Sequence, residues 1–271
     1  MKTTWPCALG VGLLALVLTS CGQREPATPE EQRARGEELL KRMSDRLAQA
    51  KAISVTTTEE IARIGRSGAS RVDRLTRIAE LRRPDRLHVR TTGTRNAEAF
   101  YEGNRLTLIS HGDKVYGEFR TPPTIDETVD VLGERYGIAL PIGDLLTDNA
   151  HRSLMSTKTT GGWTGTESVG GAMCARLEWH HPNVDWSIWV PTSGEPLPRK
   201  LHIIYKTRRG RPDARINFAD WNLATPVTDA TFARRVPADY EGVAVIAAHA
   251  APRWYMVRRV APPQRAPGAP R

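Results

Sequence analysis

Two stretches decide the fold, Asp185-Trp186-Ser187-Ile188-Trp189-Val190 and Lys200-Leu201-His202-Ile203-Ile204-Tyr205. Successive residues of a strand face opposite ways, so both stretches place apolar side chains on both faces of a sheet. An antiparallel sheet normally leaves one face in water, and apolar groups on both faces therefore need a covering layer or an apolar ligand. The sequence predicts a sheet that is covered on both faces at these strands.

Alternating runs elsewhere predict an antiparallel sheet of about eleven strands, interrupted by helices, in an α+β domain. Ala97 to Phe119 contains three short strands separated by the turn sequences Glu102-Gly103-Asn104 and His111-Gly112-Asp113. The arginine-rich stretch Ile61 to Leu81 fits neither period cleanly, and we assign it to two strands. The later strands are expected at Gly165 to Val169, Met173 to His180, Asp185 to Val190, Lys200 to Lys206 and Ala214 to Leu223.

Two capping boxes predict the helices. Thr28-Pro29-Glu30-Glu31 places a capping threonine before a proline, and apolar residues then recur at helical spacing. Thr124 to Glu127 opens a second helix, expected to run through Tyr136 and to end at Gly137, and Pro141 begins a short third piece. The apolar residues of this helical insertion are Ile125, Val129, Leu132, Leu145 and Leu146.

Composition indicates a globular chain, with 39% hydrophobic and 25% charged residues and a formal net charge of +9. We divide the 271 residues into a signal peptide (1–20), a tether (21–29), one domain (30–240), a C-terminal extension (241–260) and a disordered tail (261–271). Three cysteines are too few and too scattered for a disulfide framework.

The N-terminus resembles a bacterial lipoprotein signal. One charge at Lys2 precedes an apolar stretch from Ala8 to Leu18, which is too short to span a bilayer comfortably, and Leu18-Thr19-Ser20-Cys21 follows. The resemblance implies that a diacylglyceryl group, and acyl chains such as palmitate, attach at Cys21 and anchor the chain in a membrane of the cell envelope, facing the periplasm. Gly22 is not the aspartate that favours inner-membrane retention, so inner and outer membranes both remain open.

No motif points to catalysis, and we expect neither an enzyme nor a cofactor. His180 and His181 are adjacent in a strand and point to opposite faces, so they cannot easily share a metal ion with Asp185. Cys174 is expected to be a small core residue. We attribute Glu59-Glu60 to an exposed strand, and Asp126-Glu127 to helix capping.

Tryptophans and arginines are the remaining candidates for binding. Trp163, Trp179 and Trp221 have the character of cavity-lining or core residues, and of Trp186 and Trp189 at most one faces a cavity. The arginines between Arg63 and Arg90 form either a basic cluster for anionic head groups or a solvated surface. An exported chain rarely meets nucleic acid, and we expect no nucleic-acid partner.

The ordered landmarks carry a wider resemblance. They include Arg83-Pro84-Asp85-Arg86-Leu87, Phe100-Tyr101-Glu102-Gly103-Asn104, Arg135-Tyr136-Gly137-Ile138, Asp144-Leu145-Leu146, Pro196-Leu197-Pro198-Arg199-Lys200-Leu201 and Asp220-Trp221-Asn222-Leu223. This run resembles a family of predicted periplasmic proteins that is grouped with LolA/LolB-like lipoprotein carriers and mycobacterial LppX-like lipoproteins. The resemblance covers Glu37 to Pro237, with the extension outside the pattern, and implies a curved, incomplete barrel with helices on its concave face.

We therefore expect an anchored, non-enzymatic lipoprotein that binds a lipid or the acyl chains of a lipoprotein in a half-barrel cavity. The alternative is an envelope scaffold or sensor that fills its own core and binds a protein partner. An apolar cavity beneath the helices favours the first, and a fully packed interior the second. The residues expected to line the cavity are Trp186, Ile188, Trp189, Ile203, Tyr205, Ile125, Val129, Leu132 and Leu145.

Overall fold

The computed structural model describes residues 28–65, 69–136, 142–224 and 227–245. The predicted signal peptide, Cys21, almost all of the tether, and the tail lie outside the described residues. No helix within the described ranges is long and apolar enough to cross a bilayer.

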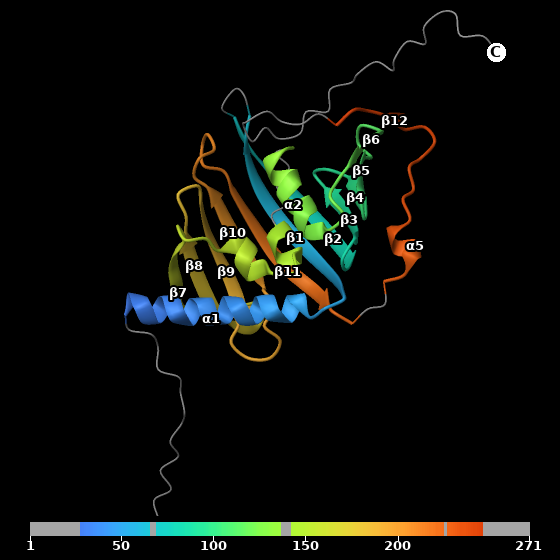
Figure 1. Cartoon of the computed structure of the whole chain (residues 1–271). Helices are drawn as coiled ribbons and strands as arrows, with labels where there is room; N and C mark the ends of the chain where they lie inside the picture. Colours follow the sequence, from blue (N-terminus) through green and yellow to red (C-terminus); the bar gives the residue numbers. More distant parts are fainter. Residues whose placement is uncertain (1–27, 66–68, 137–141, 225–226, 246–271) are drawn as a thin grey trace, which may run out of the picture.

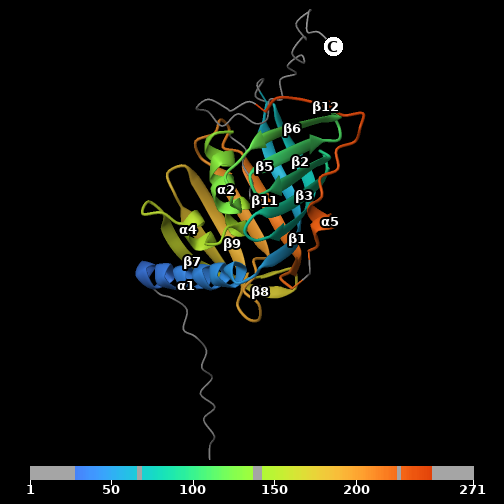
Figure 2. The same ribbon diagram turned by 45° about the vertical axis from the view of Figure 1, so that its right-hand side comes forward.

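Twelve strands form one open sheet (Figures 1 and 2). In space they follow the order β12-β6-β5-β4-β3-β2-β1-β11-β10-β9-β8-β7, and neighbours are antiparallel except for β12, which runs parallel to β6. The bounds are β1 Ala52–Ile64, β2 Ser70–Arg82, β3 Arg86–Gly93, β4 Ala97–Glu102, β5 Arg105–Ser110, β6 Val115–Arg120, β7 Thr160–Val169, β8 Ala172–His180, β9 Val184–Pro191, β10 Lys200–Tyr205, β11 Asp213–Asn222 and β12 Glu241–Gly242. The predicted antiparallel sheet is confirmed, and β12 is the strand that the sequence did not indicate.

The sheet consists of two meanders that meet at its centre. Strands β1 to β6 follow one another in space, as do β7 to β11, and β1 pairs with β11 to join the two series. In that pair Thr57 lies opposite Phe218 and Ile61 lies opposite Ala214. The two ends of the sheet, β7 and β12, do not meet, so the sheet is not closed.

Helices of the described residues lie over one face of the sheet (Figures 1 and 2). They are α1 Pro29–Ala48, α2 Ile125–Glu134, α3 Gly143–Leu146 and α4 Ala150–Leu154, while α5 Asp229–Phe232 packs beside β3 and β4. We call the face under α1 to α4 the inner face. Leu40, Met43 and Leu47 of α1 are completely buried and belong to the main apolar cluster, as the helical spacing predicts.

The two helix starts predicted at Thr28 and Thr124 are confirmed. Thr28 accepts a hydrogen bond from the Glu31 N–H at 3.2 Å, and the Glu31 carboxylate accepts one from the Thr28 N–H at 3.1 Å. Thr124 accepts from the Glu127 N–H at 3.3 Å. Helix α2 ends at Glu134, before the predicted Tyr136, and the expected stop at Gly137 and start at Pro141 lie outside the described residues.

The stretch Ile61 to Leu81, which fitted no period, contains the end of β1 and most of β2. These two strands form the longest hairpin of the sheet. Strands β1 and β2 pair along their whole length, from Ala52 opposite Arg82 to Ile64 opposite Ser70. The expectation of an exposed Glu59 is wrong, because Glu59 is 2% exposed on the inner face. Charged residues at buried positions hide the alternation of hydrophobicity that normally identifies a strand.

Helix α1 touches β7 where two glycines meet. A Cβ atom on Gly36 would lie 2.8 Å from the Cα atom of Gly162, and one on Gly162 would lie 2.4 Å from the carbonyl oxygen of Gln32. Real Cβ atoms do not approach backbone so closely, and the helix would have to move outward.

Replacing Gly162→Ala should therefore destabilise the fold by about 1–3 kcal/mol, the usual range for overpacking. The matched control is Gly112→Ala, because a Cβ there meets nothing within 4 Å. Urea unfolding of both variants measures the difference. Equal stability of the two variants would contradict the close approach of α1 to β7.

Candidate functional site

The inner face of β9 carries two of the predicted cavity residues. Trp186 and Ile188 are separated by two positions, share this face and are 6% and 0% exposed within the main apolar cluster. The Trp186 ring stacks on Trp179 of β8, with centroids 5.8 Å apart. These side chains pack on one another beneath the helices.

Trp189 lies on the opposite face of the same strand, outside the main apolar cluster. Its indole N–H donates to the carboxylate of Glu167, and the Lys200 ammonium lies 4.4 Å from the ring centroid. The structure therefore separates Trp189 from the other eight predicted cavity residues and places only Trp186 of this pair on the inner face.

Strand β10 continues the apolar layer. Ile203 and Tyr205 are partly exposed and pack against the main cluster. Burial raises the pKa of the Tyr205 hydroxyl, and the Arg208 guanidinium lies 4.0 Å from the ring centroid. Tyr205 thus stands at a boundary between apolar and charged side chains.

The helical insertion supplies the opposing apolar surface. Ile125, Leu132 and Leu145 are 2%, 3% and 0% exposed, and Val129 packs against them at the edge of the cluster. The insertion therefore fills the space over the inner face with its own side chains.

A few polar contacts hold the insertion in place. The Arg83 guanidinium donates to the carbonyl oxygens of Leu146 and Thr147, both at 2.9 Å, and at 3.2 Å to that of Ala50. The His151 N–H at the start of α4 donates to the Ser44 hydroxyl of α1 at 3.0 Å. Arg83 therefore joins the end of α3 to the segment that follows α1.

Two carboxyl groups of the insertion titrate near neutral pH. Burial raises the pKa of Asp144 to about 6, and the nearby charge of Asp130 adds to the effect. Burial and the neighbouring Asp148 side chain raise the pKa of Asp126 to about 6, although Asp126 also accepts hydrogen bonds from the Asp148 N–H at 3.0 and 3.1 Å.

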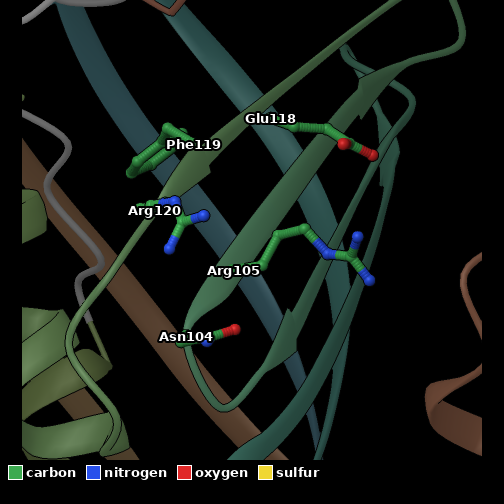
Figure 3. Close-up of a pocket in the computed structure, with 5 residues that line it drawn as sticks. All are labelled: Asn104, Arg105, Glu118, Phe119 and Arg120. Carbon is green, nitrogen blue, oxygen red and sulfur yellow. The ribbon is translucent and has the colours of Figure 1, made fainter.

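Two surface hollows lie away from these residues. One, of about 330 Å³, is lined by Asn104, Arg105, Glu118, Phe119 and Arg120 at the β5–β6 end of the sheet. Figure 3 shows Arg105 and Glu118 on one side of the strands and Phe119 on the other. The second, of about 430 Å³, lies between the start of α1 and β7. Neither is lined by a predicted cavity residue.

The other sequence candidates are placed as follows. Cys174 is 0% exposed, and burial raises the pKa of its thiol. His180 lies 3.2 Å from Asp185, whereas the His181 ring accepts a hydrogen bond from the Asn183 N–H at 3.2 Å. The part of the chain that the structure describes contains no group of three or more residues arranged to hold a metal ion.

The buried carboxyl of Asp144 predicts a pH-dependent stability. The folded chain binds this proton more tightly than the unfolded chain does, so the group stabilises the fold below pH 4 and that contribution is lost as pH rises through about 6. Asp144→Asn should be more stable than wild type by about 3 kcal/mol at pH 7.5, and the difference should fall below about 1 kcal/mol at pH 4. Thermal unfolding at both pH values measures this, with the turn variant Asp113→Asn as control. A difference that does not change with pH would contradict the burial of Asp144.

Comparison with solved structures of other proteins finds similar chains at low sequence identity and with TM-scores below 0.5. An uncharacterised conserved protein from Thermus thermophilus is 10% identical with a TM-score of 0.47, covering 77% of this chain and 98% of that one. The lipoprotein LppX of Mycobacterium tuberculosis is 10% identical with a TM-score of 0.44, covering 71% and 97%. A LolA superfamily protein from Nitrosomonas europaea is 12% identical with a TM-score of 0.39, covering 74% and 98%. No curated protein matches the chain.

The family profile described as "Predicted periplasmic protein (DUF2092)" matches residues 36–246. The match runs past Pro237, where the resemblance read from the sequence ended, and includes β12. The chain belongs to this family of predicted periplasmic proteins.

Proposed function

We propose that this chain is a non-enzymatic envelope lipoprotein, anchored through acylated Cys21, that binds a lipid or the acyl chains of a lipoprotein between the inner face and the insertion α2 to α4. The observation that carries the proposal is the continuous apolar layer formed by strands β9 and β10 with the insertion. A site for an acyl chain needs two apolar walls, and the layer has one on each side.

In this proposal the insertion acts as a lid. Ile125, Leu132 and Leu145 are buried in the main apolar cluster over the inner face. A ligand chain takes their place when the lid swings away, and burial of each methylene group contributes about 0.8 kcal/mol. The lid is held to Ser44 of α1 and to Arg83, which follows β2, by a few hydrogen bonds. In this proposal these bonds break when the lid opens.

The second candidate is a scaffold or sensor that binds a protein partner. The packed interior favours it, because the predicted cavity residues Ile188 and Leu145 are 0% exposed. The two candidates differ in whether the lid opens, and lipid binding tests this directly.

The test is mass spectrometry of organic extracts of the mature chain from residue 21, with Cys21→Ser, exported and purified without detergent. The carrier should co-purify with lipid in a one-to-one ratio, or bind added lipid and gain thermal stability from it. Absence of lipid after both steps would contradict the carrier and favour the scaffold.

A pair of isoleucine variants tests the lid. Ile125 and Ile109 are both 2% exposed, but only Ile125 belongs to the lid and the main cluster. Truncation to alanine should destabilise each chain by about 2–4 kcal/mol. Because Ile125→Ala weakens a contact that the ligand must displace, it should also bind lipid more tightly than wild type, whereas Ile109→Ala should not. Calorimetric titration with 1-oleoylglycerol measures both affinities, and equal affinities would contradict a lid.

A further inference from the structure

The indole N–H of Trp179 is a buried hydrogen-bond donor on the inner face. Trp179 is 0% exposed and belongs to the main apolar cluster, where its ring stacks on that of Trp186. In the part of the chain that the structure describes, its Nε1 atom donates to no acceptor. An indole N–H can only donate, so its hydrogen bond has to be completed by an acceptor that is brought to it.

Two other tryptophans do pair their indole N–H groups. That of Trp189 donates to the carboxylate of Glu167 on the opposite face of the sheet, and that of Trp221 donates to the carbonyl oxygen of Pro198 at 2.9 Å. Nearly all buried polar groups in folded proteins are paired, because removing a donor from water without replacing its hydrogen bond costs free energy. The exception at Trp179 therefore points to an acceptor that a ligand supplies.

Trp179 occupies the last inward-facing position of β8. The strand ends one residue later at His180, whose exposed side chain lies on the opposite face, 3.2 Å from Asp185. Toward the other end of β8 the inner face continues with Leu177, which lies opposite Ile188 of β9, and both of these side chains are 0% exposed. The donor thus lies where a row of buried aliphatic side chains meets the polar end of the strands.

The lid joins the sheet beside Trp179. Gly161 of β7 lies opposite Trp179, and only residues 155–159 separate β7 from α4 at the end of the lid. In the proposed carrier, a displacement of α4 acts on the backbone next to Trp179 and gives a ligand access to the buried N–H.

We propose that Trp179 is a ligand-binding residue whose indole N–H donates a hydrogen bond to the carbonyl oxygen of an ester-linked or amide-linked acyl chain. The acyl chain lies along Leu177 and Ile188, and the group that carries it lies toward the end of β8. The inference rests on the proposed function and deepens it, because it selects acyl esters and amides over lipids of equal length without a carbonyl group. A carbonyl oxygen suits this role because it is a strong acceptor with two lone pairs.

Calorimetric titration of the mature Cys21→Ser chain compares two probes of equal chain length. These are 1-oleoylglycerol, which has an ester carbonyl group, and its ether analogue 1-O-oleylglycerol, in which a methylene group replaces the carbonyl. Wild type should bind the ester about tenfold more tightly, because the ether leaves the buried indole N–H without its carbonyl acceptor.

Two tryptophan-to-phenylalanine variants form a matched pair, because each removes one buried indole N–H, from opposite faces of the sheet. Trp179→Phe should bind the two probes with equal affinity. Trp189 is 4% exposed and its N–H is already paired with Glu167, so Trp189→Phe should keep the tenfold preference of wild type.

The indole N–H resonance of Trp179 provides a second measurement, which needs no substitution at this buried position. In a chain with isotope-labelled tryptophan, 1-oleoylglycerol should move this proton resonance downfield, as formation of a hydrogen bond does. The ether analogue should produce a smaller shift.

Each other outcome overturns a defined statement. Equal affinity of wild type for the two probes, with no downfield shift of the Trp179 resonance, overturns the carbonyl site and leaves the proposed carrier intact. Loss of the preference in Trp189→Phe as well as in Trp179→Phe also overturns the assignment to Trp179. Binding of neither probe by wild type overturns the carrier and the carbonyl site together.

Discussion

The pairing of β1 with β11 is the interaction on which the rest of the structure depends. Each meander could form from neighbouring residues, but only this pair joins residues near position 57 to residues near position 218 in one ladder. It places the two series of strands side by side and so produces one broad inner face.

An apolar face of this width has to be covered, and the chain covers it with its own helices. Exposing this face to water would cost free energy. The helical segment between β6 and β7 covers it, at the point where the chain crosses from one end of the sheet to the other. In the proposed carrier the same segment fills the layer that a lipid chain uses, so that folding and ligand binding compete for one surface.

The inner face is not uniformly apolar, because it also buries charged side chains. Buried carboxylates at Glu59 and Asp73 are stable there only because arginines from three segments surround them. Aliphatic residues such as Ile61 and Leu75 are buried between these charged side chains on the same face.

Local patterns in the sequence were sufficient for most elements. The threonine caps at Thr28 and Thr124, the turns of the meander and the opposite orientation of Trp186 and Trp189 all depend on residues a few positions apart, and such short-range rules can be read directly. The stretch Ile61 to Leu81 could not be read in this way. Its buried positions carry charges whose partners come from neighbouring strands.

The sequence by itself determined most of the strands, the helix starts at Thr28 and Thr124, the apolar residues of the insertion and the predicted lipidation motif at Cys21. Only the tertiary structure decided that β1 pairs with β11, that Trp189 lies away from the other candidates and that Glu59 is buried. It alone brought Arg63 of β1 to Asp73 of β2, and Arg77 of β2 to Glu59 of β1. The physical reason is that strand pairing and charge compensation link residues far apart in the chain, and no local period encodes them.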